Sequence, residues 1–165
     1  MIAQICQNTE QKKLWEGAFL RNQGATKAGF ADSRTYKYGS EVVSEQVHLG
    51  LDIAGINNTQ IFAANHGKVL FVGEIGIYGN VVILDHGYGL HSLYGHLHQT
   101  NVQEGDMVRK GDLIAVSGET GLVFGDHLHY EMRINGVAVN PIEWFDNVWV
   151  LNNIEAYLPE VGEEK

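Results

Sequence analysis

Cysteine and proline are scarce in this 165-residue chain, which contains one Cys and two Pro. The single thiol, Cys6, has no partner for an internal disulfide, so a disulfide-stapled scaffold is excluded. We interpret Cys6 as a terminal thiol without a functional role. No apolar run reaches the roughly 18–20 residues that cross a bilayer. The first residues, MIAQIC, lack the basic and apolar segments of a signal peptide, which fits a cytoplasmic protein or a piece of a longer exported one.

Basic residues are also few, because 11 Lys and Arg stand against 20 Asp and Glu and give a formal charge of −9. Nucleic acids and anionic membranes are bound through basic patches. We therefore expect neither a nucleic-acid partner nor membrane contact by this segment. Part of the acidic excess lies at residues 160–164, which we interpret as a solvated tail.

Glycine, by contrast, is abundant, with 20 residues spread between short apolar runs. From about residue 46 to 139 these runs alternate or are fully apolar, and glycine-containing turns bound them, which predicts a mainly β domain. The dipeptide Asn135-Gly136 predicts a type I′ hairpin turn. The runs are VHLGLDI, TQIFAA, GKVLFVGEI, NVVILDHG, GLHSLYGHL, DLIAVSG and HLHYEMRI.

The two ends of the chain have a different pattern. Residues 1–30 are polar and weakly periodic, which predicts an N-terminal arm with at most a short helical turn. Asn140 and Pro141 resemble an N-cap and a first helical residue, with Glu143 completing a capping box. We expect a domain over 31–146, followed by a C-terminal helix and acidic tail over 147–165.

Two short motifs point to a divalent metal. Side chains two or four residues apart share one face of a strand, so His48 and Asp52 of HLGLD can face one cleft, as can His127 and His129 of HLHYE. Two imidazoles and a carboxylate suffice for a catalytic zinc that keeps a position for water. Spacing alone leaves open which three of the four are ligands.

The segment VQEGDMVRKGDLIAVSGETG is also typical of lipoyl and biotinyl domains, where an attached lysine sits at a hairpin tip. Lys110 lies at a strand entry instead, which favours a solvated turn lysine over an attachment site.

The order of the motifs resembles the catalytic domain of the M23 metallopeptidases, the lysostaphin- and LytM-like peptidoglycan endopeptidases. The resemblance covers roughly residues 30–145. It rests on HLGLD, GNVVILDHGYGL, YGHLH, VxxGDxVxKGDxI, SGxTG and HLHYE, in that order.

This resemblance implies that His48, Asp52 and His129 bind Zn²⁺ and that His127 and His96 act in catalysis. It also implies a LytM-like β-sandwich of the duplicated-hybrid-motif type, with a central antiparallel sheet and short C-terminal helices. The metal would lie on the floor of a groove whose walls are loops near residues 30–46 and 117–126.

Two departures from the family pattern are visible, and neither falls on a ligand. Residues 57–60 read NNTQ where many members have a Gly-Thr-Pro-like turn, and Asp126 precedes His127 where proline is frequent. Asp126 could change the electrostatics of the groove. Arg34 and Tyr36 lie where related chains place groove-edge residues, and Asn80 could be a groove amide or a hairpin residue.

The other histidines have simpler interpretations. His66 is expected in an exposed turn and His86 in a structural position, whereas His91 and His98 could support the metal ligands. Ligating imidazoles usually donate their second N–H to a carboxylate or carbonyl. Asp85, Glu131 and backbone carbonyls are possible acceptors, and the sequence does not choose among them.

The expected function is zinc-dependent hydrolysis of peptidoglycan cross-links in the cell envelope or periplasm, or outside the cell. The acidic chain without a wall-targeting module favours D-Ala–diaminopimelate cross-links over glycyl bridges. One alternative is an inactive LytM-like regulator of a cell-wall amidase, with an envelope protein as partner. Another is a sugar-permease phosphotransfer domain, which uses paired histidines on a similar β architecture.

Overall fold

The computed structural model describes residues 1–158, apart from the side chains of Tyr36 and Lys37. The predicted acidic tail at residues 160–164 and the predicted groove-edge role of the Tyr36 side chain therefore lie outside the described residues. No helix within the described part is both long and apolar enough to cross a membrane.

Antiparallel strands are the main regular structure of the described chain. The main sheet has the order β1-β4-β12-β8-β7-β6-β10, and β13 pairs with β12. A smaller sheet has the order β5-β11-β9, and β2 pairs with β3. The bounds are β1 Ala25–Ala28, β2 Ser33–Tyr38, β3 Glu41–Val47, β4 Leu51–Ala54, β5 Gln60–Phe62, β6 Gly67–Glu74, β7 Asn80–Gly87, β8 Leu90–Gly95, β9 Leu97–Thr100, β10 Met107–Val108, β11 Leu113–Ser117, β12 Leu128–Ile134 and β13 Val137–Val139.

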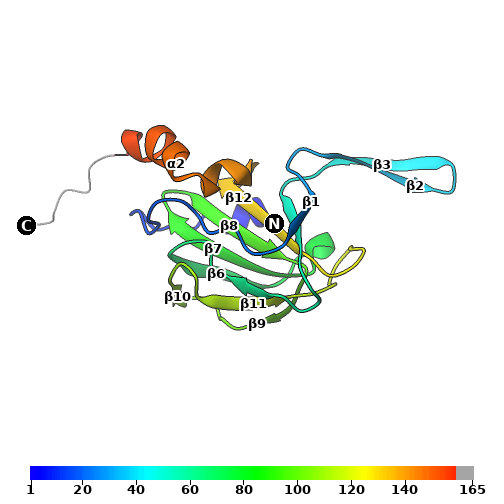
Figure 1. The fold of residues 1–165 in the computed structure, drawn as a ribbon, viewed down its shortest axis with the longest axis horizontal. Helices are drawn as coiled ribbons and strands as arrows, with labels where there is room; N and C mark the ends of the chain where they lie inside the picture. The colour runs from blue at the N-terminus through cyan, green and yellow to red at the C-terminus, as the bar shows by residue number, and fades with distance from the viewer. Residues whose placement is uncertain (159–165) are drawn as a thin grey trace, which may run out of the picture.

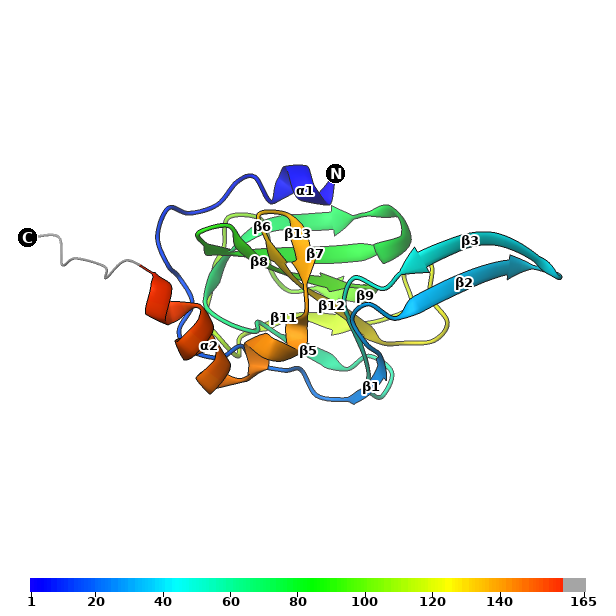
Figure 2. The same cartoon turned by 90° about the horizontal axis from the view of Figure 1, so that it is seen from above.

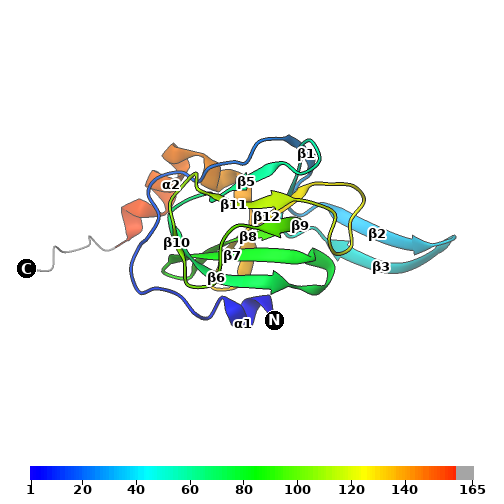
Figure 3. The ribbon, with the colours of Figure 1, turned by 90° about the horizontal axis from the view of Figure 1, so that it is seen from below.

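The smaller sheet packs against one face of the main sheet, so the body is a sandwich (Figures 1 and 3). Strand β7 shows how the sequence produces two apolar faces, because successive side chains alternate across a strand. Val82 and Leu84 join the large core between the sheets. Val81 and Ile83 join a second cluster on the opposite face, which Cys6 and the short helix α1 (Ile2–Ile5) cover. The predicted mainly β class is confirmed.

The N-terminal segment is tied to the body along its length. Leu14 N donates to His86 O over 2.8 Å, and Leu20 N donates to Ala64 O over 2.7 Å. Strand β1 then joins the edge of the main sheet beside β4. Cys6 is buried, and burial raises the pKa of its thiol to about 11.

The strands begin earlier than the sequence pattern predicts. Apolar alternation starts near residue 46, whereas the structure has β1 from residue 25 and the β2–β3 hairpin over residues 33–47. This hairpin projects from the body (Figures 1–3). Its consecutive residues Val42 and Val43 are both exposed, so neither face of β3 is buried and no alternating pattern arises.

The turn and cap predictions have mixed outcomes. Asn135 and Gly136 both have positive φ, 50° and 81°, as a type I′ turn between β12 and β13 requires. The Asn140 side chain accepts from Ile142 N, but the segment it caps, Pro141–Phe145, is a 3₁₀-helix. The α-helix α2 follows at Asn147–Asn153, and a 3₁₀ turn, Glu155–Tyr157, succeeds it. A third 3₁₀ turn, Gly76–Tyr78, joins β6 to β7.

Candidate metal centre and active site

Strand pairing brings three of the predicted residues together. Asp52 on β4 lies directly opposite His129 on β12. His48 lies between β3 and β4, four residues before Asp52. One ligand atom from each of the three lies within 4.8 Å of the others, and all three residues are buried. These atoms form a group that could hold a metal ion.

Hydrogen bonds fix which ring nitrogen of His48 and of His129 faces this group. His48 Nδ1 lies 2.6 Å from Gly29 O, and a carbonyl oxygen only accepts, so Nδ1 carries the proton. His129 Nε2 lies 2.9 Å from the carboxylate oxygen Oε1 of Glu131, and it donates there. The atoms that remain toward the centre are His48 Nε2 and His129 Nδ1, both of which are then lone-pair acceptors.

When both imidazoles are neutral, three acceptors therefore meet, and no donor among the described residues lies between them. His48 Nε2 lies 3.0 Å from Asp52 Oδ1 and 3.1 Å from His129 Nδ1, and the His129–Asp52 distance is 2.9 Å. Such an arrangement needs a positive charge at its middle. Without a metal ion, a proton on an imidazole supplies this charge: although burial opposes ionisation, hydrogen bonds from His129 and His48 then hold the pKa of Asp52 well below its usual range. Burial also opposes protonation of His129, yet hydrogen bonds to Asp52 and Glu131 raise its pKa.

The geometry of the site explains why the residue between His48 and Asp52 at position 50 is glycine. A Cβ on Gly50 would lie 2.5 Å from Tyr130 O and 2.9 Å from His129 Cε1. Contacts this short do not occur with real Cβ atoms, so a side chain here would displace β12 or the His129 ring. Glycine at position 50 lets the chain between His48 and Asp52 pass close against His129.

His96 and His127 lie beside the three-residue group. The His96 ring centroid is 4.8 Å from that of His127 and 5.8 Å from that of His129. His127 Nε2 is 3.6 Å from Asp52 Oδ1. Each Nδ1 faces a backbone carbonyl, Thr120 O for His96 over 2.9 Å and Gly125 O for His127 over 2.8 Å. Both rings therefore keep Nε2 as an acceptor, and burial lowers the pKa of His96 to about 4.

The buried Glu131 carboxylate accepts a hydrogen bond from His129 Nε2 and so orients the ring. Glu131 is fully buried, and its second oxygen accepts from Arg133 Nε over 2.6 Å. The Tyr78 ring lies 5.2 Å from the His129 ring, tilted by 60°, and burial together with the Glu131 charge raises the pKa of its hydroxyl. Residues 129, 131 and 133 of β12, together with residue 127 just before the strand, alternate along the chain and share one face. This period of two was visible in the sequence and could have selected Glu131 from the possible acceptors.

The other predicted supporting residues lie elsewhere. His91 is buried, with its ring nitrogens toward Asn8 O and Gly89 O, and Asp85 accepts from Thr9 Oγ1 and Glu10 N. Both therefore hold the N-terminal segment rather than the metal group. His98 is exposed.

Two further histidines and one amide were also given interpretations. His86 is fully buried and bonds to His66 O and Ser92 Oγ, which agrees with a structural position. His66 is half-buried rather than exposed. Asn80 begins β7, and its side-chain amide donates to Leu97 O over 3.0 Å.

Asp126 fastens the loop that leads to His127. Its Oδ2 accepts from Asn58 N over 2.9 Å, and its Oδ1 accepts from the Ser117 hydroxyl over 2.5 Å. The carboxylate is thus engaged by the loop and by the 57–60 turn, the two places where the sequence departs from the family pattern. A positioning role for Asp126 fits these contacts better than a direct effect on groove electrostatics.

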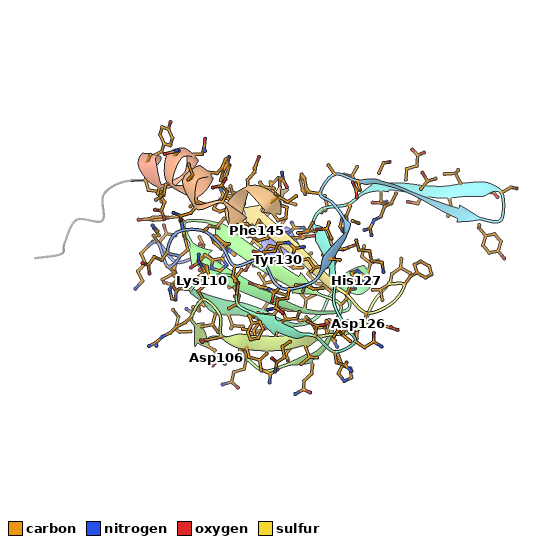
Figure 4. All side chains as sticks on the ribbon, in the orientation of Figure 1. Asp106, Lys110, Asp126, His127, Tyr130 and Phe145 are labelled. Atoms are coloured by element: carbon orange, nitrogen blue, oxygen red, sulfur yellow. The ribbon has the colours of Figure 1, made fainter. Side chains whose placement is uncertain are left out.

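The metal group opens onto a groove with two hollows, one on each side. Arg34, His96 and Leu122 line both of them. Figure 4 shows His127 and Asp126 on the side of the body from which the β2–β3 hairpin projects, while Lys110 and Asp106 lie at the opposite end. Residues from the 30–46 and 117–126 segments form walls of this groove, as predicted.

Similarity to known proteins identifies the family of this chain. The sequence profile of peptidase family M23 matches residues 46–141, more than half of the chain. The chain belongs to peptidase family M23. The predicted resemblance is thereby confirmed, and HLGLD, YGHLH and HLHYE all lie inside the matched range.

M23 relatives include both peptidases and activators. The chain is 43% identical over 97 residues to the DD-carboxypeptidase/endopeptidase Mpg of Neisseria meningitidis, covering 59% of this chain and 22% of that protein. It is 35% identical over 109 residues to the murein hydrolase activator EnvC of Escherichia coli, covering 66% of this chain and 26% of that protein. The chain thus spans about a quarter or less of the length of these curated relatives.

Solved M23 structures share the fold. A zinc-containing peptidase from Vibrio cholerae superposes with a TM-score of 0.65 at 26% identity, over 80% of this chain and 40% of that one. The catalytic domain of lysostaphin from Staphylococcus simulans gives a TM-score of 0.64 at 27% identity, over 74% of this chain and 92% of that domain. The predicted LytM-like sandwich is confirmed, and membership of a metallopeptidase family agrees with a metal at the His48–Asp52–His129 group.

Proposed function

We propose that this M23 chain is a zinc-dependent peptidoglycan endopeptidase that hydrolyses D-Ala–diaminopimelate cross-links. One observation carries the proposal. Three acceptor atoms, from His48, Asp52 and His129, converge with no donor between them, beside two imidazoles that each keep a free Nε2. A peptide hydrolase needs this combination of a cation site and adjacent proton acceptors.

Zinc fits the donor set. Two imidazole nitrogens and one carboxylate oxygen are typical ligands of a catalytic zinc with an open fourth position. Ligands at about 2.0–2.1 Å from a tetrahedral ion lie about 3.3 Å apart, and the three atoms here are separated by 2.9–3.1 Å. When bound, zinc supplies the Lewis acidity that lowers the pKa of water toward neutrality and polarises the scissile carbonyl.

His127 and His96 then handle the proton. The Nε2 atoms of both rings orient the attacking water and take its proton, and the water oxygen forms a bond to the carbonyl carbon. As the C–N bond breaks, the same proton passes to the leaving amine. The Nδ1–H bonds to Gly125 O and Thr120 O hold each ring in the tautomer that this transfer needs. Arg34 donates to Asp52 Oδ2 over 2.5 Å, which directs the other carboxylate oxygen, Oδ1, toward the metal.

The substrate and location follow from the relatives and from charge. The Neisseria relative is a DD-carboxypeptidase/endopeptidase, and the chain carries a net charge of −9. We therefore place the chain in the cell envelope or periplasm, or outside the cell. Its substrate there is the peptide part of peptidoglycan, and an envelope protein could regulate it.

The test combines digestion with metal analysis. Mass spectrometry of muropeptides released from diaminopimelate-type peptidoglycan should show monomers with a new D-Ala terminus. His129→Ala should lose zinc, whereas His96→Ala should keep zinc and lose hydrolysis. A fully active His96→Ala protein would contradict its assigned role. Cleavage of glycine-bridged peptidoglycan but not of the diaminopimelate type would contradict the assigned bond.

A second candidate function is supported by the similarity to EnvC, a murein hydrolase activator. In this case the chain would be a LytM-like regulator of a cell-wall amidase. A zinc-free purified protein that releases no muropeptides, yet stimulates an amidase, would favour this function. The complete set of five site residues favours the enzyme.

A further inference from the structure

The two hollows beside the metal group differ in what lines them. One hollow is mostly uncharged and includes Gln46, Val47, Leu49, Ile77 and Tyr78. The other includes Lys27, Ala28, Val123 and Phe124 together with Asp52 and His127. Because Arg34 and His96 line both, the hollows are the two arms of one groove that passes over the metal group.

The second hollow is cationic in an otherwise acidic chain. Lys27 and Arg34 both line it, and among the residues that the structure describes Asp52 is the only acidic one in its lining. The Asp52 charge is balanced by Arg34 and by a bound metal ion, which leaves the Lys27 ammonium as an excess positive charge. A concave site with excess positive charge attracts and holds anions.

Backbone geometry places Lys27 there. Strand β1 pairs with β4 through Thr26–Ile53 and Ala28–Asp52, so Lys27 is the extra residue of a β-bulge directly beside a metal ligand. Bulges next to active sites change the direction of a side chain. The Lys27 ammonium donates to Phe124 O over 2.7 Å, which holds it at the loop that walls the groove. An ammonium has three donors, so this bond leaves capacity for a ligand.

We propose that the hollow lined by Lys27 and Arg34 is a subsite for a substrate carboxylate adjacent to the scissile amide. This inference rests on the proposed function and specifies its substrate class. The diaminopimelate residue whose amine forms the cross-link bears a carboxyl group on the same carbon, so a free carboxylate would enter the cationic arm as the amide reaches the metal group. A cross-link with an amidated carboxyl, or a glycyl bridge, lacks this charge.

The test compares two cross-link peptides that differ only at that carboxyl group, one free and one amidated. In each, the scissile amide is replaced by an uncleavable ketomethylene unit, and binding to the zinc-loaded chain is measured by calorimetry. The free carboxylate should bind about five- to tenfold more tightly, in the range of a charge-assisted hydrogen bond or exposed ion pair. The preference should shrink at high salt, because screening weakens exposed charge pairs.

The variant Lys27→Gln should reduce the carboxylate-over-amide affinity ratio about fivefold, and Lys27→Arg should restore it. Lys110→Gln is the matched control, because Lys110 is also an exposed lysine that donates to a backbone carbonyl, Ala18 O, at the far end of the body. It should leave the ratio unchanged. Unfolding midpoints show whether each variant folds.

Equal binding of the two peptides by the unmodified chain would overturn the subsite, as would a ratio that Lys27→Gln does not change. Failure to bind either peptide would overturn it too. A failure of the proposed function is separate, since it appears as intact cleavable cross-links in the muropeptide digestion whatever the binding ratio.

Discussion

The molecule contains two buried groups of histidines and carboxylates, and they have opposite hydrogen-bond balances. In the first, around Asp52, three acceptors converge with no donor between them. In the second, around Asp85, every carboxylate oxygen meets a protein donor: Thr9 Oγ1 and Gly87 N at one oxygen, and Glu10 N at the other. The same residue types thus form a candidate cation site in one place and hold the N-terminal segment in the other.

The difference teaches that burial of histidine and aspartate does not identify a metal site. A metal site is instead indicated where hydrogen-bond acceptors outnumber donors at a place that opens onto a groove. A buried polar group without a partner is costly, so the group around Asp52 implies a ligand from outside the chain. The group around Asp85, in which each carboxylate oxygen has a protein donor, stabilises the fold without a ligand.

The largest expected effect comes from removing either carboxylate. Asp52→Ala should abolish metal retention through gel filtration and reduce hydrolysis to background, because the cation site loses its only charged ligand. Asp85→Ala should retain the metal but lower the free energy of unfolding by about 3 kcal/mol, since it leaves buried donors unpaired. Metal analysis and urea titration measure the two. Metal loss from a folded Asp85→Ala protein would mean that the groups are coupled.

Metal removal should affect the first group alone. A ligand that binds only the folded state adds about 4 kcal/mol at a thousandfold excess over its dissociation constant. Chelation should therefore lower the unfolding midpoint of the unmodified chain and have little effect on Asp52→Ala. A chelator that lowers both midpoints equally would show that the metal stabilises the fold at another place.

Acid should destabilise the fold through His86, which lies beside the group around Asp85. Burial lowers the pKa of His86 to about 4, below its ordinary value of 6.5. Between these two pKa values the unfolded state therefore binds a proton that the folded state does not. The free energy of unfolding has its full value above pH 6.5 and falls as the pH drops toward 4. The loss attributable to this residue is about 3 kcal/mol. Urea titrations of the unmodified chain and His86→Gln between pH 7.5 and 4 should show a smaller loss in the variant, and identical slopes would refute this assignment.

The smallest effect is expected from the residue that orients His129. Glu131→Gln keeps an oxygen near His129 Nε2 but removes the charge that makes this imidazole a stronger ligand. Metal affinity should fall about 10–100-fold, the usual cost of losing such a partner. A competition titration with a chromophoric chelator measures it. An unchanged affinity would mean that ring orientation, rather than the charge, is what Glu131 supplies.

Much of the fold was predictable because the core strands are apolar and regularly punctuated. Strands β6, β7 and β12 appear in the sequence as alternating or continuous apolar runs, and Asn135-Gly136 marks the turn between β12 and β13. The β2–β3 hairpin was not predictable from periodicity, because neither of its faces is buried. The bulge at Lys27 depends on pairing with β4, a contact between distant segments that no local pattern encodes.

By itself the sequence predicted five candidate site residues, because the spacing within HLGLD and HLHYE is a local property of the chain and the family motif YGHLH adds His96. Only the tertiary structure decided how these residues are used. It set His129 opposite Asp52 and chose Glu131 over Asp85 as the partner of His129. It also fixed each imidazole tautomer against a particular carbonyl or carboxylate. Those choices depend on which backbone and carboxylate groups lie within about 3 Å of each ring, and that is decided only when distant strands pair.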